Sequence, residues 1–290
     1  MTTNNPVSLR DTSENLSDPT LYSGSSLVPD FLAKKNVHPR DEFITFDEGP
    51  HIYTVHGEQG YTSATTFVHM HFPKFDGEGV AEKLTKSRKM EDPTYEHYNK
   101  TKEQIQAEWA KNGKESSEAG TKLHYDIECY YNEQPTNTNN SIEYQYFLQF
   151  VKHFPELTPY RTEWMVYWEE YKISGSIDMV FENPDGTIQI YDWKRTKSID
   201  HEPSYGNSSA ITPCISHMPN SNFWHYSIQL NMYKTILETK YGKKVTGLYL
   251  VRLHPNNVYK TYERIEVPFL DEEISDLLTW WSEGRMPSHN

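Results

Sequence analysis

Two aspartates and a lysine lie in two neighbouring strand-like segments of this 290-residue chain. Asp178 lies inside the first segment, and Asp192 and Lys194 end the second. Successive side chains of a β-strand point to opposite faces, so Asp192 and Lys194 share one face and Trp193 points to the other. Residues 183–186 between the segments read Asn-Pro-Asp-Gly, which is strong turn chemistry. They predict a hairpin that brings Asp178 beside Asp192.

Two carboxylates and a lysine at one sheet edge suit metal-dependent hydrolysis of a phosphodiester. Carboxylate oxygens are good ligands for Mg²⁺ or Mn²⁺. The bound metal can activate water and neutralise phosphate charge, while the lysine positions the nucleophile or stabilises the transition state. A simpler alternative exists for each piece, because Asp-x-Lys is common on solvated strands, where it is structural.

Five elements in a fixed order resemble the PD-(D/E)XK nucleases, in particular the RecB-type exonuclease branch. These elements are Gly120-Thr121-Lys122-Leu123-His124, the run from Glu163, the run from Ile173 to Asp178, Asp192-Trp193-Lys194, and the Gln-x-x-x-Tyr motif of Gln229 and Tyr233. Five elements in the right order are far more specific than any one of them. The resemblance spans roughly residues 50 to 270. It implies an α/β (mixed α+β) fold with a mixed central sheet flanked by helices, and metal-dependent cleavage of DNA.

The resemblance also implies a role for each residue of the hairpin. Asp178 and Asp192 would bind one or two Mg²⁺ or Mn²⁺ ions, with the Trp193 carbonyl as a further ligand. Lys194 would orient the attacking water. His124 would complete the metal shell or hold the phosphate.

A predicted helix carries Gly120, His124 and Glu128 on one stripe, because they are spaced by four residues. The glycine would allow close approach of another backbone or a ligand. On spacing alone the histidine is more often structural, and the resemblance is what favours a functional role. Glu128 is by default a solvated or salt-bridged carboxylate. Glu163 matches an acidic position near the active site, although a charge on an edge strand explains it equally well.

Gln229 and Tyr233 share one face of a later helix. They form either a buried hydrogen-bonded pair or a contact with DNA or the lysine, and both interpretations can hold together. Arg195 and Lys197 lie at the base of a long segment, residues 198–222, that shows no clear element. A loop this long is usually functional or disordered. We expect it to act as a lid or strand guide, with Lys194 and these two cations as the best local phosphate contacts.

The composition limits how nucleic acid is held. The net charge of −13 argues against a protein that grips DNA mainly through extended phosphate contacts, so any binding groove must be locally basic. Aromatic residues make up 14 % of the chain, and some of these rings are expected to stack on bases of a single strand. Packing in the core is their default use.

The two cysteines, Cys129 and Cys214, cannot form a four-thiolate iron–sulfur site, so no such cluster is expected. We expect reduced thiols, because no secretory segment is apparent. No apolar run approaches the roughly 20 residues of a membrane span. The sequence therefore predicts a soluble, intracellular protein without a membrane partner.

The chain divides into three predicted regions. Residues 1–40 read as a flexible tail that can still dock through Leu27, Val28, Phe31 and Leu32. Residues 41–118 read as a hairpin followed by a charged helical region in two pieces, broken near Asp92-Pro93, which is either a salt-bridged surface or an arch over the site. Residues 119–290 form the nuclease core. Within it we predict helices at 142–154, 223–241 and 270–284, and strands at 163–168, 247–253 and 258–267.

The leading hypothesis is a metal-dependent deoxyribonuclease, an exonuclease that acts on DNA ends or single strands in repair, recombination or genome maintenance. Replication or recombination proteins are candidate partners. One alternative is an endonuclease of the same fold that acts on RNA or branched DNA. Another is a nucleic-acid-binding module without turnover, against which the intact Asp178, Asp192 and Lys194 count.

Overall fold

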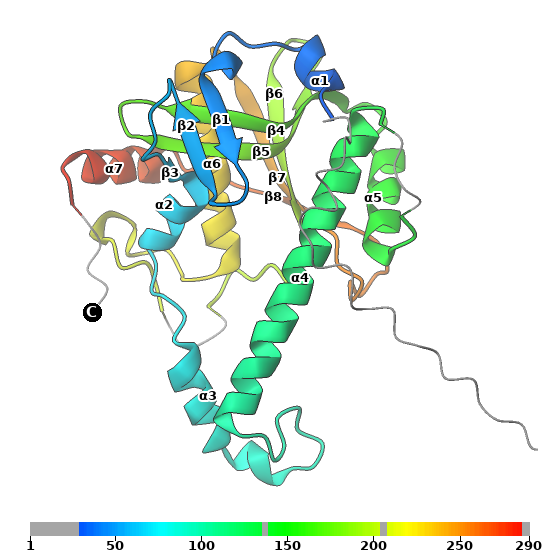
Figure 1. Cartoon of the computed structure of the whole chain (residues 1–290), viewed down its shortest axis with the longest axis vertical. Coiled ribbons are helices and arrows are strands. Elements are labelled where there is room, and N and C mark those ends of the chain that lie inside the picture. The colour runs from blue at the N-terminus through cyan, green and yellow to red at the C-terminus, as the bar shows by residue number, and fades with distance from the viewer. Residues whose placement is uncertain (1–28, 135–138, 204–207, 286–290) are drawn as a thin grey trace, which may run out of the picture.

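A six-stranded mixed β-sheet forms the centre of the protein (Figure 1). The computed structural model describes residues 29–134, 139–203 and 208–285. The strand order is β3-β5-β6-β7-β8, and β4 also pairs with β5. The strands are β3 (Thr62–Ser63), β4 (Thr158–Trp168), β5 (Ile173–Glu182), β6 (Ile188–Lys194), β7 (Val245–Arg252) and β8 (Glu263–Glu266). The β3–β5 and β6–β7 pairs are parallel and the others antiparallel, which confirms the predicted mixed sheet.

Helices cover both faces of the sheet. One face packs on α2 (Ala64–Met70), α6 (Asn222–Lys240) and α7 (Asp271–Ser282), and the other on α4 (Lys102–Tyr131) and α5 (Ile142–His153). The alternation of β6 explains the two layers, because Ile190 joins the first cluster while Tyr191 and Trp193 join the second. None of the described helices is long and apolar enough to cross a membrane.

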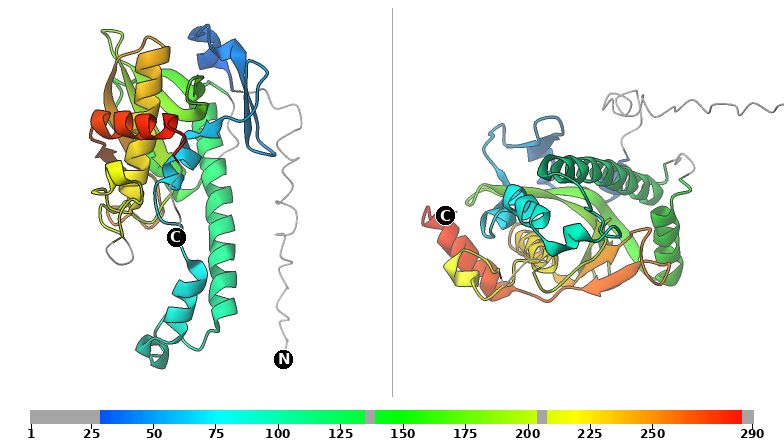
Figure 2. Two further views of the ribbon diagram at one scale, coloured as in Figure 1. Left: turned by 90° about the vertical axis from the view of Figure 1, so that its left-hand side faces the viewer. Right: turned by 90° about the horizontal axis from the view of Figure 1, so that it is seen from below.

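The helix α4 is 30 residues long, and its first half leaves the body of the protein (Figures 1 and 2). It pairs there with α3 (Gly77–Thr85), which is followed by the short helix η4 (Arg88–Glu91). The break near Asp92-Pro93 is confirmed, because η4 ends at Glu91 and α4 begins at Lys102 with a capping box at Thr101. We call the projecting residues 77–118 the arm. Because α4 runs without interruption through residues 118 and 119, that predicted boundary falls inside a helix.

The charges of the arm are largely paired. Ion pairs join Lys86 to Glu82, Lys102 to Glu78, Lys100 to Glu108, Lys111 to Glu115 and Lys114 to Glu118, at 2.5 to 3.8 Å. This pattern matches the predicted salt-bridged surface. The role of an arch over the site stays a prediction.

The predicted flexible tail is wrong from residue 29 onwards, but the predicted docking through Leu32 is confirmed, whereas Phe31 is 39 % exposed. Residues 1–28, including Leu27 and Val28, lie outside the described residues. The helix α1 (Phe31–Lys35) docks through Leu32, which is 2 % exposed and whose N–H donates to Asn132 Oδ1 at 2.9 Å. Burial of one leucine and one backbone donor outweighs the polar composition of the segment. The short helix η3 (Asp41–Phe43) then leads into the predicted hairpin, β1 (Ile44–Asp47) and β2 (Ile52–Val55).

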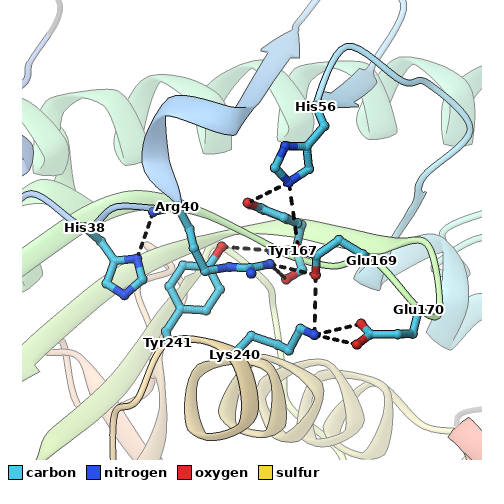
Figure 3. Close-up of polar contacts among 8 residues, drawn as sticks. All are labelled: His38, Arg40, His56, Tyr167, Glu169, Glu170, Lys240 and Tyr241. Atoms are coloured by element: carbon cyan, nitrogen blue, oxygen red, sulfur yellow. Dashed lines mark hydrogen bonds and ion pairs between the residues drawn. The ribbon is translucent and has the colours of Figure 1, made fainter.

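A polar network ties this N-terminal region to β4 and α6 (Figure 3). The Arg40 guanidinium lies 3.9 Å from the centre of the Tyr167 ring and donates to the Tyr167 carbonyl and to Glu169. Lys240 of α6 contacts Glu169 at 3.6 Å and Glu170 at 2.7 Å. The network fixes the hairpin against the same strand that carries Glu163.

Two predicted strands differ in extent from those in the structure. The strand predicted at 163–168 begins at Thr158, and the strand predicted at 258–267 is reduced to 263–266. Residues 254–262 form turns instead, because the Asn257 side chain donates to the carbonyls of Arg252 and Thr261 and closes a loop. The segment 198–222 contains the short helix η5 (Pro213–Ile215), and its residues 204–207 lie outside the described residues.

Candidate active site

The strands β5 and β6 separate at Asp178. Their ladder runs from Glu182–Ile188 to Met179–Tyr191, so Asp178 is the first residue beyond it. There the Asp178 side chain takes the place of a backbone acceptor, since its Oδ2 accepts the Trp193 N–H at 2.9 Å. The turn that joins the strands has Gly186 at φ 81°. The hairpin therefore forms as predicted and places both aspartates where the inner strands β5 and β6 part, rather than at an edge of the sheet.

Three side chains from three elements converge beside this point. His124 of α4 places Nδ1 3.5 Å from Asp178 Oδ2 and 3.9 Å from Glu163 Oε1. One potential ligand atom from each of the three residues lies within 4.8 Å of the others. The His124 Nε2 faces the Trp193 carbonyl oxygen at 2.8 Å. The structure thus brings His124, Asp178 and Trp193 together as the resemblance implied.

Glu163 joins this group through an unusual backbone conformation. It lies between Thr162 and Trp164, which pair with β5, and has a φ of 40°. A non-glycine residue in this region costs on the order of 1–3 kcal/mol and persists where the surrounding structure holds it. Ser176 Oγ donates to Glu163 Oε2 at 2.8 Å and keeps the carboxylate in place. Glu163, ranked below the other acids from sequence, is therefore as well placed as Asp178.

Asp192 and Lys194 form a buried pair next to this group. Their ion pair measures 2.6 Å, and Asp192 is 3 % exposed. The Lys194 ammonium also lies 4.4 Å from the centre of the Tyr226 ring, which comes from α6. Sequence reasoning missed Tyr226. Its signal was the spacing, because Tyr226 precedes Gln229 by three residues and Tyr233 by seven, which puts all three on one helical face.

The electrostatics of the site reflect acids buried close together. Burial raises the pKa of Asp178, and burial with the neighbouring Asp178 charge raises the pKa of Asp192 to about 6 although Lys194 opposes it. Burial lowers the pKa of His124, but the carboxylates of Asp178 and Glu163 outweigh it and raise the pKa to about 9. The pKa of Lys194 is raised, because Asp192 and Asp178 outweigh its burial. Lys194 is therefore a cation at neutral pH.

This donor set fits a hard divalent cation. Two carboxylates, an imidazole and a backbone carbonyl are oxygen and nitrogen ligands of the kind that Mg²⁺ and Mn²⁺ accept. A cation there would relieve the repulsion that raises the pKa values of the acids. Asp178, Glu163 and His124 are the residues that would hold it, with the Trp193 carbonyl within reach. Asp192 is paired with Lys194, and its expected role as a metal ligand stays a prediction.

Glu128 and Gly120 differ in their relation to the site. Glu128 is half-buried on α4, and burial together with Glu163 and Glu48 raises its pKa to about 8. It is therefore no simple solvated carboxylate. Gly120 precedes Glu128 by eight residues on α4, and a Cβ added to it would meet no atom within 4 Å. The expected close approach of another backbone is wrong among the described residues.

The Gln229–Tyr233 pair forms as the simpler interpretation proposed. Gln229 Nε2 donates to Tyr233 Oη at 3.3 Å and to Thr65 Oγ1 at 3.0 Å. Tyr233 is buried against Gly175, where a Cβ would come 2.6 Å from its Cε1. From this helix it is Tyr226 that contacts Lys194. A contact of Gln229 or Tyr233 with DNA stays a prediction.

Arg195 and Lys197 are placed differently from one another. Arg195 Nε donates to Glu143 of α5 at 2.6 Å, which holds the guanidinium against the protein. Lys197 is exposed, and its carbonyl accepts from Arg252 at 2.7 Å. Of these two predicted phosphate contacts, which the sequence analysis named together with Lys194, Lys197 is thus the more accessible.

Comparison with known proteins places the chain in a family. Two solved structures show weak similarity. The structure of SSO0001 has 13 % identity and a TM-score of 0.32, and the match covers 91 % of this chain and 88 % of that one. A Eubacterium rectale protein whose given name includes the word exonuclease has 12 % identity and a TM-score of 0.27, and the match covers 51 % of this chain and 66 % of that one. Similarities at this level add nothing to the assignment. No curated protein matches the chain. The sequence model of the PD-(D/E)XK nuclease superfamily matches residues 66–288, and the chain belongs to that superfamily.

Proposed function

We propose that this protein is a RecB-like, metal-dependent deoxyribonuclease, and that it acts as an exonuclease on DNA ends or single strands. The observation that carries the proposal is the meeting of His124, Glu163 and Asp178 beside the Asp192–Lys194 ion pair. Membership in the PD-(D/E)XK superfamily implies a metal-dependent nuclease. The substrate, the direction of digestion and a role in repair or recombination are the parts that are proposed.

The side chains divide the work of hydrolysis. A Mg²⁺ or Mn²⁺ ion bound by Asp178, Glu163 and His124 would lower the pKa of a water ligand and neutralise phosphate charge. Lys194 is held by Asp192 on one side and by the Tyr226 ring on the other. Because its raised pKa keeps it protonated, Lys194 donates hydrogen bonds to the attacking water or to the phosphate oxygens. It does not accept the proton.

Preference for a free end follows from the charge of the protein. With a net charge of −13, long-range attraction to DNA is weak, so affinity must come from metal, a few cations and aromatic rings in a confined site. A strand that enters by its end satisfies this requirement better than a duplex gripped along its length. Replication or recombination proteins would supply such ends.

The test is digestion of matched substrates. The purified protein is incubated with end-labelled single-stranded DNA, duplex DNA, closed circular DNA and RNA, with Mn²⁺ or with EDTA. We expect Mn²⁺-dependent release of short products from linear DNA, no linearisation of circles, and activity lower by about 10²–10³-fold in the Lys194→Ala variant. Rapid linearisation of circles would favour the endonuclease alternative, and binding without cleavage in Mn²⁺ would favour a non-catalytic module.

A further inference from the structure

The loop between β7 and β8 exposes two apolar side chains next to each other. Val258 is 80 % exposed and Tyr259 89 %. These are the highest exposures among the large hydrophobic residues in the described part of the chain. Scattered single hydrophobic residues are normal on a surface, whereas an adjacent pair with a ring almost wholly in solvent marks a candidate contact.

Hydrogen bonds at its base fix the loop that carries this pair. Asn257 is 3 % exposed, and its Nδ2 donates to the Arg252 carbonyl at 3.2 Å and to the Thr261 carbonyl at 2.8 Å. His254 Nδ1 accepts the Asn256 N–H at 3.1 Å. A closed, hydrogen-bonded turn thus carries the exposed ring. Because the loop is already ordered, it loses less conformational entropy when a ligand binds.

The loop leaves the sheet at the level of the candidate active site. β6 and β7 are parallel, so both end at the same edge, and Lys194 pairs with Arg252. The next residue, Leu253, donates its N–H to the Lys194 carbonyl at 2.8 Å. A nucleic-acid strand whose scissile phosphate lies at Lys194 would therefore find this loop beside it.

The base of the loop is positively charged in a protein that is strongly negative. Burial lowers the pKa of His254. The nearby positive charges of Arg195, Lys197 and Arg252 lower it further, while the negative charge of Glu143 raises it. Lys260 follows Tyr259 in the loop itself. Glu143 and Glu263 pair with Arg195 and Arg252, which leaves Lys197 and Lys260 as the cations in excess. This sign matches the phosphates of a nucleic acid.

We propose that the β7–β8 loop, residues 254–262, is a base-stacking subsite, in which Tyr259 stacks on a base of the single strand that extends beyond the scissile phosphate. Lys197 and Lys260 contact the adjoining phosphates. This inference rests on the proposed function. It specifies the path of the DNA strand beyond the active site and the ring, Tyr259, on which a base stacks. Single-stranded nucleic acid is the occupant because an exposed ring lies next to exposed cations here, as in strand-binding grooves.

The test compares Tyr259→Ala with a matched aromatic truncation. Phe269 is 47 % exposed and follows β8, whose end lies at the opposite edge because β8 runs antiparallel to β7. Binding of a fluorescent single-stranded DNA 15-mer is measured by anisotropy with Ca²⁺ in place of the catalytic metal. We expect Tyr259→Ala to bind roughly 5- to 150-fold more weakly, the loss of one stacked base, while Phe269→Ala binds like the wild type. Tyr259→Trp should retain affinity.

A second readout separates this inference from the proposed function. A p-nitrophenyl ester of thymidine monophosphate carries a scissile phosphodiester but no strand to reach the loop. Tyr259→Ala should cleave it in Mn²⁺ as fast as the wild type. Equal 15-mer affinity for Tyr259→Ala and the wild type would overturn the subsite even if both cleave DNA. Absence of DNA cleavage by the wild type in Mn²⁺ would overturn the nuclease proposal. The DNA affinities measured by anisotropy would still decide whether the loop is a base-stacking subsite.

Discussion

His124 Nε2 lies 2.8 Å from the Trp193 carbonyl oxygen, while Nδ1 of the same ring faces Asp178 at 3.5 Å. One imidazole thus joins α4 to the middle of β5 and the end of β6. Both of its neighbours are potential metal ligands. A bound cation must therefore take over contacts that His124 now makes, and its binding is linked to the proton on the ring.

This linkage predicts pH-dependent metal affinity. The pKa of His124 is raised to about 9, so the ring is protonated at neutral pH and must lose a proton to bind metal. Mn²⁺ affinity should rise with pH between about 7 and 9, with proton release visible by calorimetry in buffers of different ionisation enthalpy. Glu128, with a pKa of about 8, titrates in the same window, so the Glu128→Gln variant serves as the control. Affinity independent of pH in that variant would argue against His124 as a ligand.

Substitution of each carboxylate should show whether it binds the metal ion or serves as the ion-pair partner of Lys194. Asp178→Ala and Asp192→Ala are expected to abolish cleavage with little change in fold, because each removes an acid from a site of mutually repelling charges. Glu163→Gln should lower Mn²⁺ affinity at least about 10-fold, since its carboxylate belongs to the His124 group. Calorimetry measures the affinities and circular dichroism the fold. Unchanged turnover in Asp178→Ala would remove it from the site.

Lys194 should act on chemistry more than on binding. Lys194→Ala is expected to lower kcat by about 10²–10³-fold while Mn²⁺ and DNA bind nearly as in the wild type, because a fixed cation acts mainly on the transition state. Tyr226→Leu keeps an apolar side chain but removes the ring beneath the ammonium. It should lower kcat less than Lys194→Ala does. Weakened DNA affinity with normal kcat at saturation would make Lys194 a phosphate contact only.

Glu128 should make the metal-free protein less stable at alkaline pH. Burial, Glu163 and Glu48 raise its pKa from 4.5 to about 8, so between these values the folded state binds a proton that the unfolded state has lost. The free energy of unfolding must then fall as the pH rises through this window. Glu128→Gln should therefore be more stable than the wild type in urea at pH 8.5, by an amount that shrinks towards pH 5. A constant difference at both pH values would show that charge is not the cause.

Gly175 is required by Tyr233. A Cβ on residue 175 would lie 2.6 Å from Tyr233 Cε1, so the buried ring must shift. Gly175→Ala should cost about 1–3 kcal/mol of unfolding free energy by urea denaturation. In a Tyr233→Leu background the same substitution should cost much less, because the clashing atoms are gone. Additive costs in the double variant would disprove the contact.

The hairpin of the site could be predicted because its determinants are local. The alternation of β6 and the turn at 183–186 act over a few residues, and they suffice to place Asp178 near Asp192 and Lys194. The helix stripe of His124 and the Gln229–Tyr233 pair follow in the same way from a spacing of four. The N-terminal segment was predicted only in part. Docking through Leu32 followed from its apolar side chain, whereas the polar composition of the segment did not indicate the helix at residues 31–35.

Packing between elements determines which side chains from distant segments meet. Glu163 reaches His124 because its positive φ inside β4 turns its side chain towards the site. No local sequence pattern predicts that backbone angle. Tyr226 lies over Lys194, and Glu143 holds Arg195, because α6 and α5 pack on opposite faces of the sheet. The turn at 183–186, the strands that flank it and the spacing of the candidate ligands were predictable, since these depend on neighbours along the chain. The partners of Glu163, Lys194 and Arg195 depend on packing between elements, which sequence spacing does not encode.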